Sequence, residues 1–149
     1  MRSFRIFAVW TVLAVFTAPS LLAAEFGVRA GRHNDSREEF VGAEMAFGSS
    51  VVFNPNIEYW LNSDVTVLSG NADLLFQFGR GTFQPYVGGG LGVLYSDNVF
   101  GSTSDPLFNL IGGIRFNLDI LKPYAQVKYF RLFESGGGDD IAITVGMRF

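Results

Sequence analysis

Hydrophobic and polar residues alternate along most of the chain after residue 24. In the last ten residues, one face of an extended strand would carry Ile141, Ile143, Val145, Met147 and Phe149. Residues 108–118 repeat the same split. No stretch after residue 24 sustains the apolar stripe of an amphipathic helix, whose period is about 3.6 residues. The pattern therefore predicts an all-β protein.

This alternation divides the chain into eight predicted strands. They cover residues 25–33, 40–48, 54–61, 65–78, 83–95, 107–118, 122–132 and 140–149. The connections at 79–82 and 119–121 are short, and a further join lies near 49–53. Those at 34–39, 62–64, 96–106 and 133–139 are polar or glycine-rich and mostly long. Long loops at one end and short turns at the other, with both termini on the short-turn side, are typical of an eight-stranded antiparallel up-and-down transmembrane β-barrel.

The prolines fit this division. A closed barrel has no edge strand on which the missing proline N–H would be harmless. Pro55, Pro85, Pro106 and Pro123 all fall at or near predicted strand starts, and we expect none in a strand centre.

If the apolar face of each strand points outward, the aromatic residues form two belts. At the end that holds the termini we expect Phe26, Phe47, Phe53, Phe78, Phe83, Phe116 and Phe149. At the other end we expect Phe40, Tyr59, Tyr95, Phe108 and Tyr129. In the alternative arrangement, the aromatic residues fill the interior of a soluble antiparallel barrel and the charged residues lie outside.

The opposite face carries charged residues that are segregated by sign. The second to fourth strands contribute the acids Glu44, Glu58 and Asp73. The first, sixth, seventh and eighth contribute the bases Arg29, Arg115, Lys128 and Arg148. Eight strands leave an interior that side chains just fill, and opposite charges inside it can pair. We therefore predict a lumen charge network of these seven residues and no open channel. Gly88, Gly90 and Gly92 on this face would leave room for large inward groups such as Tyr86 and Tyr124, or permit the strand to bend.

The first 24 residues predict a cleaved signal peptide. Arg2 and Arg5 precede an apolar run at residues 6–16, and small residues follow at Ala23 and Ala24. The run is too short to span a bilayer as a helix, which needs roughly 20 residues. We expect cleavage after Ala24 or one residue earlier, which divides the chain into residues 1–24 and a barrel domain at 25–149.

Composition adds limits on partners and compartment. Removing residues 1–24 from the 149-residue chain takes away two arginines, which leaves 9 basic and 14 acidic residues, a formal charge of −5. This argues against non-specific nucleic-acid binding, which depends on cationic contacts to phosphate. The chain has no cysteine, although small exported domains often rely on disulfides. Its 16 Phe and 18 Gly suit aromatic belts and tight turns.

Two segments carry a family resemblance. Residues 84–92, Gln-Pro-Tyr-Val-Gly-Gly-Gly-Leu-Gly, resemble a strand of small outer-membrane barrels of the OmpA-transmembrane, OmpX and opacity-porin type. The ending at Val145, Met147 and Phe149 resembles the C-terminal assembly signal of outer-membrane proteins. The resemblance implies a porin-family fold in the outer membrane of a Gram-negative envelope, with lipid, lipopolysaccharide and the outer-membrane assembly machinery as partners. We expect a monomer without an OmpA-like peptidoglycan-binding domain.

Candidate chemistry is sparse. His33, the only histidine, is expected at a loop base on the surface, beside an acidic loop, and Ser63 and Asp64 lie in the next outer loop. Some outer-membrane barrels modify lipid A, but the chain lacks the His-x-Ser motif of lipid A deacylases. The acidic loop matches no calcium-binding spacing. We expect no enzyme activity, no cofactor and no metal site. The expected role is structural or surface-interacting, with a narrow or gated porin-like pore and a lipid A-modifying enzyme as alternatives.

Overall fold

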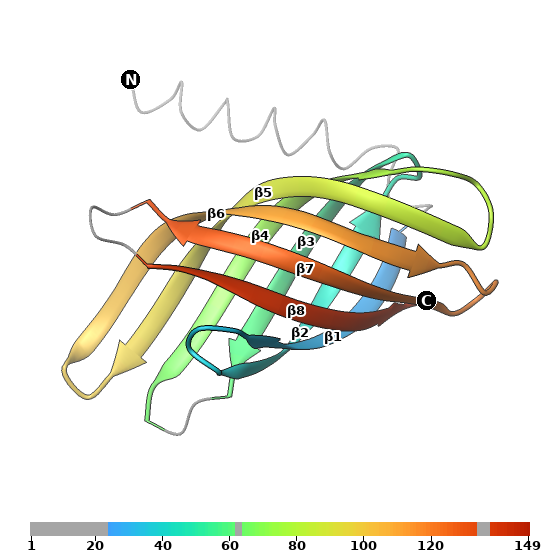
Figure 1. Ribbon diagram of the computed structural model, residues 1–149. Helices are drawn as coiled ribbons and strands as arrows, with labels where there is room; N and C mark the ends of the chain where they lie inside the picture. The colour runs from blue at the N-terminus through green and yellow to red at the C-terminus, as the bar shows by residue number, and fades with distance from the viewer. Residues whose placement is uncertain (1–23, 62–63, 134–137) are drawn as a thin grey trace, which may run out of the picture.

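Eight strands, each hydrogen-bonded to the next and the last to the first, close into an antiparallel barrel (Figure 1). This computed structural model describes residues 24–61, 64–133 and 138–149. The strands are β1 (Ala24–His33), β2 (Glu39–Phe47), β3 (Val51–Trp60), β4 (Thr66–Gln77), β5 (Phe83–Asn98), β6 (Gly101–Phe116), β7 (Lys122–Leu132) and β8 (Asp139–Arg148). The predicted fold class is confirmed. The predicted signal peptide lies outside the described residues, apart from Ala24.

The barrel closes where β1 meets β8. Their register runs from Gly27 opposite Arg148 to His33 opposite Ala142. At the end of this seam, Phe26 and Phe149 exchange two backbone hydrogen bonds, of 3.0 and 2.8 Å between nitrogen and oxygen. Closure leaves no open sheet edge between these strands. No helix in the described part of the chain is long and apolar enough to cross a membrane.

The predicted long loop at residues 96–106 is wrong. β5 and β6 stay paired as far as Asn98 opposite Gly101, so that only Val99 and Phe100 form the turn. Figure 1 shows this hairpin turning at the end of the barrel opposite the C-terminus. Side chains there are exposed on both faces of the hairpin, so the sequence has no apolar and polar alternation to mark a strand.

The expectation that no proline lies in a strand centre is also wrong. β3 begins at Val51, three residues earlier than predicted, and Pro55 lies in its middle. The pairing of β2 with β3 is interrupted there, between Glu44 opposite Asn56 and Phe47 opposite Phe53. The side-chain amide of Asn54 donates to the Met45 carbonyl oxygen at 2.7 Å. It thus supplies the donor that the proline nitrogen lacks. Pro106 lies within β6, just before its ladder with β7 begins.

The outer surface of the barrel is apolar and bounded by aromatic residues. Phe26, Leu110 and Ile143 are more than half exposed, at 54%, 57% and 62%. Eleven of the twelve residues expected in the two belts point outward, and Phe40 is the exception. It is 1% exposed and lies inside, because residues 40 and 47 are an odd number apart and a strand cannot place both on one face.

Candidate functional site in the barrel interior

Five charged side chains inside the barrel form one chain of ion pairs. Arg148 contacts Glu44, with nitrogen–oxygen distances of 3.2 and 3.3 Å. Arg29 bridges Glu44 and Glu58 at 3.6 and 3.4 Å. Lys128 then donates to Glu58 at 2.6 Å. All five side chains are at most 2% exposed, so each charge depends on its partners for the compensation that water would otherwise give.

Asp73 belongs to a cluster of amides. It accepts hydrogen bonds from Asn56 at 2.8 Å and Asn109 at 3.0 Å, and it takes part in none of the ion pairs between described residues. Asn71 donates to Asn56 at 3.1 Å and accepts from Asn109 at the same distance. The cluster is continuous with the ion pairs through Asn54, which donates to Glu44 at 2.8 Å and accepts weakly from Asn56 at 3.5 Å.

Arg115 lies in a separate group near the end that holds the C-terminus. It donates to Gln84 at 3.0 and 2.7 Å and pairs with Glu25 at 3.0 Å. Lys122 also pairs with Glu25. Of the seven charged residues predicted inside, the structure therefore joins five by ion pairs, connects Asp73 to them through amide hydrogen bonds, and places Arg115 in a separate group.

Glycines set the positions of the large interior groups. A Cβ at Gly90 would overlap the Asp73 carboxylate, and one at Gly92 would overlap the Asn71 amide. Gly90 and Gly92 therefore make room for inward side chains, as expected, but these belong to the neighbouring β4 and are not Tyr86 and Tyr124. The glycines that face these two rings are Gly113 and Gly146, on β6 and β8.

Above the polar layer, away from the C-terminus, apolar side chains fill the barrel. They are Phe40, Trp60, Val67, Leu94, Leu107, Phe130 and Ala142, which we call the aromatic plug. His33 packs inside it, with its ring centroid 4.0 Å from that of Trp60 and 5.1 Å from that of Phe40. The expectation of a surface histidine is wrong, because His33 is 1% exposed. His33 lies four residues after Arg29 on β1, so both side chains point to the same, inner face.

Between the plug and the polar layer lies one small cavity, lined by residues that include His33, Glu58 and Lys128. It offers about 10 Å³ for the centre of a water-sized sphere, which is room for about one water molecule. The interior is thus polar in its middle and apolar toward the loops. The expected lumen of polar side chains included neither the plug nor a second buried apolar cluster, which contains Val52, Leu75 and Ile111.

The loop between β1 and β2 is tied down by Asp140. Its carboxylate accepts backbone hydrogen bonds from Asp35 at 2.8 Å and Ser36 at 3.2 Å. Ser63, named above with His33 and Asp64, lies outside the described residues. Within residues 24–61, 64–133 and 138–149, no group of three or more histidine or carboxylate side chains is arranged to hold a metal ion.

Sequence reasoning missed two kinds of interior residue. Glu25, at the predicted mature N-terminus, gave no sign that it would pair with Arg115. Gln84 and Asn54 each lie two residues from another inward position on their strands, Tyr86 and Asn56, and this parity could have identified them.

Comparison with known proteins identifies the fold. No protein family and no curated protein match the sequence. The structure is similar to the N-terminal β-barrel domain of OprF from Pseudomonas aeruginosa, with a TM-score of 0.71 and 16% identity over 85% of this chain and 96% of that one. Neisserial surface protein A gives 0.68 and 12%, over 84% and 94%. The outer-membrane enzyme PagL gives 0.59 and 10%, over 84% and 98%. The chain therefore has the fold of small outer-membrane barrels.

Proposed function

We propose that this protein is an outer-membrane β-barrel with a structural or surface-interaction role and a closed interior. The observation that carries the proposal is the distribution of its side chains. Apolar residues cover the outside between two aromatic belts, while ion pairs and amides fill the middle of the inside. A water-soluble barrel requires the reverse, and a barrel in a lipid bilayer requires this one.

The interior supports a structural role rather than conduction. The chain of five charges crosses the lumen from Arg148 on β8 to Lys128 on β7 by way of β2, β1 and β3. The aromatic plug then fills the end that faces the loops. An ion would have to displace both layers, and eight strands give little space for that.

A non-catalytic role is supported by the position of the only histidine. His33 is enclosed by Phe40, Trp60 and Phe130, and neither ring nitrogen has a hydrogen-bond partner among the described residues. A general base must come within hydrogen-bond reach of the proton that it removes. PagL shares the fold and is an enzyme, but likeness of fold does not carry activity.

In the proposed orientation both termini face the periplasm, and the loops and the β5–β6 hairpin face outward. The partners are then outer-membrane lipid and lipopolysaccharide around the wall, and the assembly machinery at the C-terminal strand. The outer loops carry any specific recognition, since binding residues concentrate on loops held by a rigid scaffold.

Planar-bilayer recording tests the closed interior. Purified protein in the bilayer should give no steady conductance, whereas a porin inserted in the same way gives open channels. Steady, ohmic conductance by the wild type would favour the pore alternative.

Fractionation tests the membrane location: the mature protein should fractionate with the outer membrane and shift its gel mobility on boiling. Recovery from the soluble periplasm without detergent would contradict the barrel proposal itself.

A further inference from the structure

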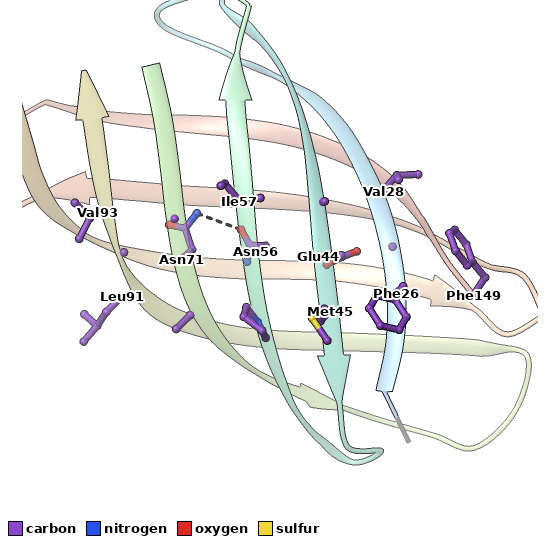
Figure 2. A pocket seen from close by; sticks show the side chains of 16 residues that line it. Phe26, Val28, Glu44, Met45, Asn56, Ile57, Asn71, Leu91, Val93 and Phe149 are labelled. Carbon is purple, nitrogen blue, oxygen red and sulfur yellow. Dashed lines mark hydrogen bonds between the residues drawn. The ribbon is translucent and has the colours of Figure 1, made fainter. Parts of the chain in front are cut away.

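A trough of about 980 Å³ runs along the outside of the barrel over β1 to β5. Its walls are outward-facing residues such as Phe26, Val28, Leu91 and Val93, and Phe149 closes one end (Figure 2). The trough is shallow and open along its length, so it would contact a ligand from one side only. Figure 2 shows Leu91 and Val93 on the far side of the trough from Phe26 and Val28.

Small outward residues make the floor. Ala43, Pro55, Gly70 and Ala72 lie in the floor over β2, β3 and β4, together with the larger Met45 and Ile57. The outward positions of β6 to β8 carry mainly large side chains, such as Leu110, Val127, Ile143 and Val145. A Cβ added at Gly70 would meet no atom within 4 Å. Among the described strands, small outward residues are thus more frequent on β2 to β4 than on β6 to β8.

The position of the trough indicates what fills it. It lies on the apolar surface and reaches the aromatic belt near the termini through Phe26 and Phe149. In the proposed orientation this is the acyl-chain layer of the periplasmic leaflet. We propose that the trough binds one acyl chain of a phospholipid of that leaflet, an inference that rests on the proposed membrane location.

Shape decides between an acyl chain and a second copy of the barrel. A two-fold interface sets the same patch of both copies face to face, so two troughs would enclose a void instead of filling one. Within the bilayer, association gains from close packing and not from removal of water, so an unfilled void is unfavourable. A flexible acyl chain can follow the floor past Ala43, Gly70 and Ala72.

A large side chain in the floor should weaken retention of the lipid. Gly70→Phe places a ring in the trough, and Gly112→Phe is the matched control, because Gly112 also faces outward on β6 with nothing within 4 Å of an added Cβ. Barrels extracted with mild detergent from phospholipid vesicles can be weighed by native mass spectrometry. Wild type and Gly112→Phe should retain one phospholipid. In Gly70→Phe its occupancy should fall about tenfold, or roughly 1.4 kcal/mol of binding free energy.

Equal lipid occupancy in the three proteins would overturn the inference. It would also be overturned if barrels extracted from native outer membrane retained lipopolysaccharide in place of phospholipid. A complex of two barrels that is lost in Gly70→Phe and kept in Gly112→Phe would also overturn the inference, in favour of a second copy of the protein. Ala72→Leu provides a second floor-filling variant if Gly70→Phe does not fold. A barrel that inserts in vesicles but retains no lipid contradicts only this inference, whereas a barrel that never inserts contradicts the proposed function.

Discussion

Glu58 pairs with both Arg29 and Lys128 and is 1% exposed. Glu58→Ala leaves two buried cations with less compensation. We expect it to lower the free energy of unfolding by roughly 3–5 kcal/mol, whereas Glu39→Ala, at an exposed position, should change it by less than about 0.5 kcal/mol. Denaturant unfolding in lipid vesicles measures both. Equal losses would mean that the faces of the strands are inverted.

His33 should contribute as a packed ring and not as a proton carrier. His33→Ala opens a cavity in the aromatic plug and should cost about 2–4 kcal/mol, whereas His33→Phe should stay within roughly 1.5 kcal/mol of the wild type. Trp60, whose ring centroid is 4.0 Å from that of His33, provides a fluorescence signal for unfolding.

The lipid A profile of cells that overproduce wild type or His33→Phe should be the same by mass spectrometry. An acyl chain that is lost or gained with the wild type and not with the variant would instead indicate an enzyme.

Parity along a strand explains which interior residues could be predicted. Arg29, Glu44 and Lys128 were assigned to the interior from alternation, and the structure places them there. The same rule, carried to the end of β1 and the start of β2, puts His33 and Phe40 inside as well. Phe40 was placed in a belt because an aromatic residue near a loop suits one by composition, and His33 was placed on the surface because an acidic loop follows it. The position of each on its strand forbids both placements.

At the level of elements, β3 tolerates Pro55 because Asn54 replaces the missing donor. Asn54→Ala should therefore cost about 1–3 kcal/mol, since it leaves the Met45 carbonyl and Glu44 short of a partner. In a Pro55→Ala background the restored N–H can reach Met45, so the same substitution should cost about 1 kcal/mol less. A double-mutant cycle of unfolding free energies measures this coupling. Strict additivity would rule out the compensation.

The β1–β8 seam makes the last residue important for assembly. Phe149 exchanges two backbone hydrogen bonds with Phe26, and its side chain lies in the outer belt. Deleting Phe149 should lower the amount of folded, heat-modifiable barrel in the membrane far more than Ser102→Ala in the exposed β5–β6 hairpin. Phe149→Ala keeps the backbone of residue 149 and removes the ring, so it separates the contribution of the backbone hydrogen bonds at the seam from that of the side chain. Unchanged levels after the deletion would argue against a C-terminal assembly signal.

Strands were predictable where one side faces the apolar exterior and the other the interior. β7, at Lys122–Leu132, has the predicted bounds. The paired segments next to the β5–β6 turn were missed because their residues have similar surroundings on both faces. Pairing there depends on the backbone of the hairpin and leaves no mark in the side chains. Which acid pairs with which base also depends on register and tilt across the lumen, which strand patterns do not contain.

For the whole molecule, closure of eight strands determines both the filled lumen and the apolar wall. The number of strands followed from the sequence. The hollow over β1 to β5 did not, because its residues lie far apart in the chain. Ala43 and Gly70, for example, come to flank Ile57 only when β2, β3 and β4 pair.

The central claim is that the apolar wall contacts lipid. The chain has no cysteine, so single spin labels can be placed at Leu110 on β6, at Ile143 on β8 and at Phe100, which is 98% exposed at the hairpin tip. Collision rates with oxygen, which concentrates in bilayers, and with a water-soluble nickel chelate should then be measured in vesicles. Labels at 110 and 143 should favour oxygen, and the label at 100 should favour nickel. Nickel accessibility at 110 and 143 equal to that at 100 would contradict the membrane barrel.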